Sequence, residues 1–147
     1  NTLTVTGPQI YRNKTYTVSV RSQDGSLVAV RSLSVAPSAN TVHMYEIHPL
    51  LGVLLEMSLF GSVPIRGSEM SVLVEPYYFS TNSRAGSNVQ YSWSLNGSRT
   101  DNPGSDIGIM SLRPSGTGYA ELGIQLNGST SYLENASRAV TLTFNAE

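Results

Sequence analysis

The feature that most constrains the fold is an alternation of apolar and polar side chains at residues 89–95. Four apolar residues alternate with three polar ones, in the order Val89, Gln90, Tyr91, Ser92, Trp93, Ser94 and Leu95. This is the period of a strand with one buried face. Asn96-Gly97 follows at once, and this dipeptide accepts the positive φ angles of a tight turn. The pattern predicts a central strand that directs Trp93 into the core.

The same two-residue period recurs along the chain and predicts further strands. They cover residues 2–6, 15–20, 26–35, 41–47, 63–66, 69–75, 107–112, 119–126 and 138–144. Asp24-Gly25 predicts a hairpin turn, and a change of the apolar face near Arg31-Ser32 predicts a bulge. Short strands at this spacing, without a helical pattern between them, predict an all-β chain folded as an antiparallel sandwich.

Three regions are expected from the order of these segments. Residues 1–40 form a β-hairpin segment, residues 41–60 connect through a strand and a short apolar segment, and residues 61–147 form the sandwich. The apolar part, Pro49 to Phe60, is predicted either as one or two helical turns or as an irregular lid. Gly52 in its middle weakens the helical alternative.

The region 61–147 resembles an immunoglobulin-like sandwich of the polycystic-kidney-disease-repeat kind, which occurs in bacterial and archaeal surface proteins. The resemblance rests on four stretches: Ser68-Glu69 to Glu75, Tyr91-Ser92-Trp93 with Asn96-Gly97, Gly116-Thr117-Gly118-Tyr119, and Ala139 to Phe144. It implies a sandwich fold and an extracellular or cell-surface location. It implies little about activity, because such sandwiches serve many roles.

Residues 15–35 resemble the last two strands of a preceding domain of the same kind. The chain then begins partway through a sandwich, and the hairpin, which is marginal on its own in water, must pack on something. The missing strands are expected either from segment 41–47 or from a neighbouring molecule. In the second case, strand donation would build a fibre.

Composition and charge disfavour several functional classes. Only 13% of the 147 residues are charged, the net charge is −1, and there is no cysteine. We therefore expect no nucleic-acid partner, no thiolate metal site and no disulfide. No apolar run reaches the roughly 18–20 residues of a membrane span, and no signal peptide opens the chain. The missing initiator methionine indicates a mature or excised piece.

The aromatic run after the predicted strand 69–75 is a candidate ligand-binding site. Tyr77, Tyr78 and Phe79 lie in a predicted loop with Arg84, and aromatic rings beside an arginine can stack on a sugar. The alternative is that the aromatic side chains plug the open end of the sandwich, since large exposed apolar patches are uncommon on monomers.

Other motifs have simpler interpretations. N-glycosylation sequons begin at Asn13, Asn96, Asn127 and Asn135, and all four fall at predicted turns. The run Asp101 to Asp106 offers oxygen ligands for Ca²⁺, but its residue types also favour an ordinary turn. His43, Glu46 and His48 do not converge on one face of a strand, so no metal site is expected.

The sequence therefore favours a non-catalytic structural module, a stalk, adhesin or filament subunit of a prokaryotic cell surface. Its expected partners are other copies of itself or neighbouring domains of a surface protein. The alternative function is a carbohydrate- or ligand-binding module that uses the loop aromatics. No cofactor is expected, and the chain contains neither a Gly-x-Ser-x-Gly elbow nor a phosphate-binding Gly-rich loop.

Overall fold

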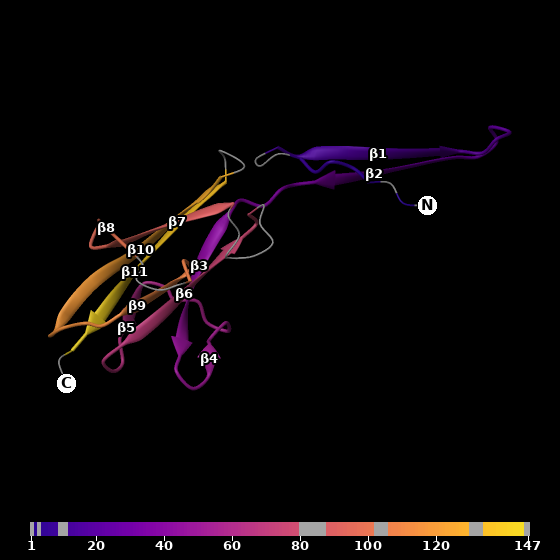
Figure 1. The fold of residues 1–147 in the computed structure, drawn as a ribbon. Helices are drawn as coiled ribbons and strands as arrows, with labels where there is room; N and C mark the ends of the chain where they lie inside the picture. The colour runs from indigo at the N-terminus through magenta and orange to yellow at the C-terminus, as the bar shows by residue number, and fades with distance from the viewer. Residues whose placement is uncertain are drawn as a thin grey trace. The chain divides into compact units, whose positions relative to one another are not determined.

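The computed structural model describes residues 2, 4–8, 12–79, 88–101, 106–129 and 134–145. The chain divides into two units, Asn1–Ala39 and Asn40–Glu147. Every regular element within the described residues is a strand, which confirms the all-β class (Figure 1). Within that part of the chain, no helix has the length and apolar character needed to cross a membrane.

Unit 1 contains an antiparallel hairpin of β1 (Lys14–Arg21) and β2 (Val28–Val35). The turn at Asp24-Gly25 is confirmed, and Gly25 has a φ angle of 73°. The Asp24 carboxylate accepts hydrogen bonds from the hydroxyls of Ser22 (2.6 Å) and Ser26 (2.8 Å) and from the Ser26 backbone N–H (3.1 Å). These donors stabilise the ionised form and lower the pKa of Asp24 to about 2.

The predicted bulge at Arg31-Ser32 is wrong, because β2 pairs with β1 without interruption from Val28 to Val35. The prediction assumed that all apolar residues of β2 must face one core. Instead, Val28 and Val30 lie on one face of the hairpin and Leu33 lies on the other, and all three side chains are exposed. With no single core to face, the strand can change its apolar side without an extra residue.

Directly paired residues share a face of a sheet, and in this hairpin the register collects apolar side chains on one side. This apolar hairpin face consists of Lys14, Tyr16, Val18, Val20, Ala29, Arg31, Leu33 and Val35. The other side is more polar, and there the hydroxyls of Thr17 and Ser32 lie 2.9 Å apart. Val18, Val20 and Leu33 are 47%, 61% and 65% exposed, so the hairpin buries little of its apolar face.

Unit 2 is a sandwich of two sheets (Figure 1). The five-stranded sheet has the order β5-β11-β10-β7-β8, and the four-stranded sheet has the order β4-β3-β6-β9. Their bounds are β3 (Thr41–His48), β4 (Gly52–Val53), β5 (Ser62–Pro64), β6 (Met70–Tyr77), β7 (Val89–Leu95), β8 (Ser98–Thr100), β9 (Ile109–Leu112), β10 (Gly118–Gly128) and β11 (Asn135–Phe144). Strand β5 runs parallel to β11, and the other pairs are antiparallel.

The core between the sheets contains the inward residues that the alternation predicts. Trp93 is 3% exposed, and its indole N–H donates to the Ile107 carbonyl over 3.1 Å. Alternate residues of β6, β10 and β11 are also buried, namely Met70, Val72, Val74, Leu122, Ile124, Leu126, Val140 and Leu142. The predicted inward direction of these side chains is confirmed.

Strand β3, predicted from the sequence to belong to a connecting region, is an interior strand of the four-stranded sheet. It pairs with β6 from Thr41 opposite Tyr77 to Ile47 opposite Ser71, and β4 adjoins its other edge. Val42 and Met44 are buried in the common core. The sandwich is therefore built from residues that begin at Asn40, where unit 2 starts.

Residues 49–60 form no helix, so the predicted helical turns are wrong. Gly52 has a φ angle of 76°, and after it the chain returns along β3. The Leu54 N–H donates to the Glu46 carbonyl (2.9 Å) and the Leu59 N–H to the Met44 carbonyl (2.8 Å). These backbone N–H groups donate to strand β3, so they cannot also donate to the i−4 carbonyls of a helix.

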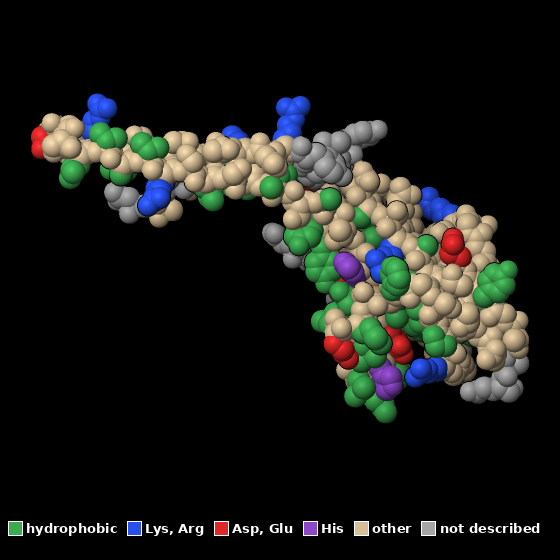
Figure 2. Space-filling model, turned by 180° about the vertical axis from the view of Figure 1, so that it is seen from behind, with side chains coloured by type: hydrophobic (Ala, Val, Ile, Leu, Met, Phe, Trp, Pro, Cys, Tyr) green, Lys and Arg blue, Asp and Glu red, His purple; other side chains and the backbone are tan. Residues whose placement is uncertain are grey.

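Five large apolar side chains of this stretch point into solvent. We call them the apolar segment: Leu50, Leu51, Leu55, Met57 and Phe60. Leu50 is 88% exposed and Leu51 is 74% exposed, and only the neighbouring Leu59 enters the core. The predicted apolar lid is thus exposed in large part. Figure 2 shows hydrophobic side chains gathered at the end of the sandwich that carries β4.

Candidate functional site: a polar trough on the five-stranded sheet

A trough with a volume of about 570 Å³ lies on the outer surface of the five-stranded sheet of unit 2. Two rows of residues cross neighbouring strands there. In the first row, Ser94 of β7 lies opposite Gly123 of β10, which lies opposite Ala139 of β11. In the second row, Gln125 of β10 lies between Ser92 and Ser137.

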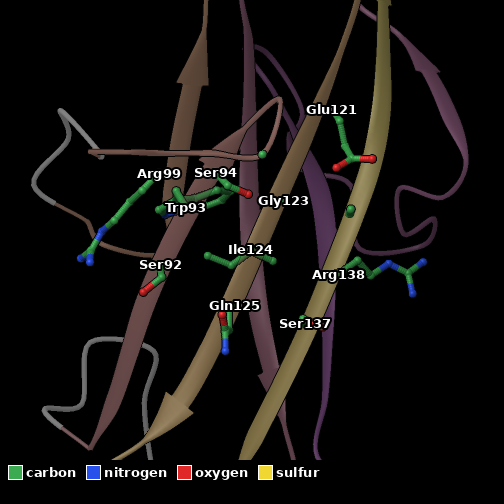
Figure 3. A pocket seen from close by; sticks show the side chains of 12 residues that line it. Ser92, Trp93, Ser94, Arg99, Glu121, Gly123, Ile124, Gln125, Ser137 and Arg138 are labelled. Carbon is green, nitrogen blue, oxygen red and sulfur yellow. The ribbon is translucent and has the colours of Figure 1, made fainter.

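The trough is hollow because small side chains meet at its floor. Gly123 has no Cβ, and a Cβ built there would lie 2.5 Å from the Ser94 Oγ. Larger residues stand around this row. Figure 3 shows Arg99 at the β8 side, and it shows Glu121 and Gln125 on the two sides of Gly123 along β10. Arg99 and Glu121 are both exposed.

The turn beside the trough is the predicted Asn96-Gly97 turn, with φ angles of 50° and 79°. The Asn96 Oδ1 accepts a hydrogen bond from the Glu121 N–H over 2.8 Å, and the Asn96 N–H donates to the Glu121 carbonyl over 2.8 Å. These two bonds fix the turn to β10. Arg99 pairs with Ser94 and extends the small-residue row, and Glu121 lies beside that row, two residues from Gly123 along β10.

The trough is lined in part by side chains that can form hydrogen bonds. Its lining residues provide serine hydroxyls, one amide, two arginines and one carboxylate. The two histidines of the chain, His43 and His48, are on β3 in the other sheet. Ser92, Ser94 and Ser137 therefore have no imidazole base within the trough, and Glu121 is a single carboxylate without a second acid.

The alternation of apolar and polar residues does not predict the trough, because it assigns the outer strand faces to solvated surface. One signal was present: Gly123 interrupts the β10 pattern, and a glycine within a strand often marks a close approach of neighbouring groups. The cross-strand register, which brings Ser94 and Ala139 beside Gly123, was not available from one sequence.

The candidate aromatic residues fall in different environments. Phe79 is 9% exposed and belongs to the core, as the plug interpretation predicts. Tyr78 is 65% exposed and has a φ angle of 64°, which is uncommon for a residue with a Cβ. The Asn40 amide donates to the Tyr78 carbonyl over 2.5 Å and holds this conformation. Arg84 lies outside the described residues.

Tyr77 lies at the end of β6 and joins an aromatic cluster on the four-stranded sheet. Its hydroxyl is 3.1 Å from the Tyr45 hydroxyl, and its ring meets the His43 ring edge-on with 5.2 Å between centroids. The hydrogen bond with Tyr45, together with partial burial and the nearby Glu75 charge, raises the pKa of Tyr77 to about 12. Tyr77 and Tyr78 therefore do not form one stacking platform with Phe79.

The other candidate residues are placed as follows. Three sequon residues, Asn13, Asn96 and Asn135, are exposed, and Asn127 is half-buried in β10. The His48 Nδ1 accepts hydrogen bonds from the backbone N–H groups of Leu50 and Leu51, both over 3.2 Å.

Metal-binding candidates are not brought together in the part of the chain that the structure describes. There, no three His, Asp or Glu side chains are grouped so that they could hold a metal ion. Residues 102–105 of the acidic run lie outside that part, while the Asp106 carboxylate accepts a bond from the Gly108 N–H over 2.9 Å.

Comparison with known proteins adds no assignment. No protein-family model matches the chain, and no curated protein matches it either.

Proposed function

We propose that this chain is a non-catalytic structural module of a prokaryotic cell surface, which assembles with further copies by strand pairing at its hairpin. The observation that carries the proposal is the two-stranded sheet β1-β2, in which neither strand has a second neighbour among the described residues. A hairpin of this size is marginally stable alone and gains stability when another strand adds to it.

The hydrogen-bond pattern tells which backbone groups are free to pair. The Ser22 N–H donates to the Leu27 carbonyl over 2.9 Å, so Ser22 and Leu27 form a hydrogen-bonded pair. Hydrogen-bonded and non-hydrogen-bonded pairs alternate along an antiparallel ladder. Residues 15, 17, 19 and 21 of β1, and residues 28, 30, 32 and 34 of β2, therefore direct their backbone N–H and C=O groups outward.

The composition also supports a surface module. Charged residues are scarce and cysteine is absent. The resemblance to polycystic-kidney-disease repeats, which rests on the Tyr91-Ser92-Trp93 strand and its Asn96-Gly97 turn, supports the same extracellular role. The exposed sequon residues Asn13, Asn96 and Asn135 are accessible for glycosylation in such a setting.

A proline at Ser19 tests the proposal. Proline removes an outward N–H but no bond of the hairpin itself, because Ser19 and Val30 form a non-hydrogen-bonded pair. We expect Ser19→Pro to lose self-association, measured by sedimentation velocity, if β1 provides the pairing edge. Ser32→Pro tests β2 in the same way. Ser19→Ala keeps the N–H and is the matched control.

Association of both proline variants to the same extent as the unmodified chain would contradict strand pairing. A chain that stays monomeric at all concentrations would contradict assembly altogether.

One observation favours a second candidate function, ligand binding at Tyr78. Its ring is exposed and its carbonyl is fixed by Asn40, in a backbone conformation of the kind that clusters at functional sites. A glycan array tests this candidate: Tyr78→Ala should abolish binding while circular dichroism stays unchanged. If the unmodified chain binds no glycan on the array, this second candidate fails for carbohydrates.

A further inference from the structure

Two separate surfaces of the chain expose large apolar side chains. One is the apolar hairpin face of unit 1, and the other is the apolar segment of unit 2. Figure 2 shows exposed hydrophobic side chains along the hairpin and at the end of the sandwich. Exposed apolar groups gathered in this way commonly mark interaction surfaces.

The two units carry opposite net charges. Residues 1–39 contain the basic residues Arg12, Lys14, Arg21 and Arg31 and the acidic residue Asp24, a net charge of +3. Residues 40–147 contain five arginines and nine acidic residues, a net charge of −4. The net charge of the whole chain is near zero because a basic hairpin and an acidic sandwich offset each other. The hairpin of one copy and the sandwich of another therefore attract each other.

The opposite charges also lie at the two apolar surfaces themselves. Lys14 and Arg31 share the apolar hairpin face, where the Lys14 Nζ is 5.1 Å from the Tyr16 ring centre. Glu56 is exposed within the apolar segment, between Leu55 and Met57. Arg138 is also at this segment, 5.4 Å from the Phe60 ring centre, and donates to the Leu59 carbonyl over 3.1 Å.

From these observations we infer that the apolar hairpin face of one copy packs on the apolar segment of the next copy. This inference rests on the proposed assembly through the hairpin and names the surface that receives it. The contact joins two different surfaces. Each pair of copies therefore still offers one hairpin face and one apolar segment, and the same contact can repeat head to tail.

A second copy suits the apolar segment better than a membrane does. An anionic lipid surface would repel a unit with a net charge of −4, and insertion of the segment would carry Glu56 toward hydrocarbon. The hairpin of another copy offers apolar contact together with Lys14 and Arg31, which can neutralise Glu56 at the rim of the contact.

The test uses one charged variant on each surface. Val20→Glu places a carboxylate on the apolar hairpin face, and Leu51→Glu places one on the apolar segment. We expect each variant alone to sediment as a monomer. An equimolar mixture should form a complex of two chains, because the intact hairpin of one variant meets the intact segment of the other. Ser19→Glu, on the opposite hairpin face, and Tyr119→Glu, on the five-stranded sheet, should associate like the unmodified chain.

Several outcomes would overturn the inference. If Val20→Glu is monomeric but Leu51→Glu still associates, the hairpin contacts a surface other than the apolar segment. In that case the proposed function stands and this inference falls. If Val20→Glu still associates, this inference falls, while the proposed strand pairing is decided by Ser19→Pro and Ser32→Pro. If the unmodified chain is a monomer, both fall. A mixture that stays monomeric also excludes the head-to-tail contact.

Engineered cysteines give a second measurement that does not depend on the charged variants. Because the chain has no cysteine, Val20→Cys and Leu51→Cys proteins carry one thiol each. Mild oxidation of their mixture should enrich the mixed disulfide over both homodimers. Thr17→Cys, on the other side of the hairpin, replaces Val20→Cys in the control and should give no enrichment with Leu51→Cys. Equal yields in the two mixtures would contradict the contact.

Discussion

Gly123 of β10 lies opposite Ser94 of β7, and the Ser94 hydroxyl occupies the position that a Cβ on Gly123 would need. A Cβ on Gly123 would come within 2.5 Å of the Ser94 Oγ, well inside van der Waals contact. The floor of the polar trough therefore depends on both residues together. Gly118 on the same strand is a useful contrast, because its added Cβ would lie 3.7 Å from the Phe144 ring.

We expect Gly123→Ala to move the Ser94 hydroxyl out of its rotamer and to lower the free energy of unfolding by up to about 1 kcal/mol. Adding Ser94→Ala should recover most of this loss, because the Ser94 Cβ itself would lie 3.9 Å from the new methyl group. Urea unfolding of the two single variants and the double variant measures the coupling. Gly118→Ala is the control and should cost little. Equal losses in Gly123→Ala and in the double variant would refute the clash.

Trp93→Phe should lower the free energy of unfolding by about 2 kcal/mol, because it removes core volume and leaves the Ile107 carbonyl without its indole donor. The loss can be measured by chemical denaturation followed by circular dichroism. Fluorescence of the unmodified chain provides a check, since Trp93 is the only tryptophan and is buried. Its emission should shift to the red on unfolding. An emission maximum already at the position of free tryptophan would contradict the burial.

The hairpin turn should respond to acid through Asp24, whose pKa falls from 3.8 to about 2 because the Ser22 and Ser26 donors favour the carboxylate. A lowered pKa in the folded state means that the stabilisation is present above pH 4 and is lost as the pH falls toward 2. An NMR titration of the Ser26 amide should show this transition. In Ser22→Ala/Ser26→Ala the midpoint should return toward 3.8. A midpoint near 3.8 in the unmodified chain would show that the hydroxyls do not stabilise the carboxylate.

Tyr78→Gly should be more stable than Tyr78→Ala by about 1 kcal/mol, because only glycine adopts a positive φ without a steric cost from Cβ. The exposed Tyr78 side chain contributes little burial in either case. Thermal unfolding of the two variants gives the difference. Ser92, which has an ordinary backbone conformation in β7, serves as the reference: Ser92→Gly should be less stable than Ser92→Ala. The same order at both positions would contradict the positive φ at Tyr78.

Sequence alternation predicted the strands best where one face is buried. For β6, β10 and β11, the inward residues Val72, Leu122 and Val140 could be identified directly, because a single core imposes a two-residue period. The same reasoning failed at Arg31-Ser32, where neither face of the hairpin is covered. It also failed at residues 49–60, whose leucines are spaced as in a helix but whose backbone N–H groups at Leu54 and Leu59 donate to β3.

The candidate sites were harder to predict, because a site depends on residues that are distant in the sequence. The trough needs Ser94 beside Gly123 and Gly123 beside Ala139, and only the strand register brings them together. The aromatic run illustrates the opposite case. Tyr77, Tyr78 and Phe79 are consecutive, yet the positive φ of Tyr78 turns the chain there, and Phe79 enters the core while Tyr78 does not.

The position of β11 has a consequence for synthesis on the ribosome. Although it follows every other strand along the chain, it lies inside its sheet, between β10 and β5. Among the described residues, strand β5 pairs with β11 alone, so it has no partner until residues 135–144 leave the exit tunnel. Until then, the edges of β5 and β10 that pair with β11 have no partner. The sheet is completed by pairing across nearly eighty positions, from Ser62 to Thr141. A translational pause before residue 135 would leave these two strand edges available to a strand from another molecule.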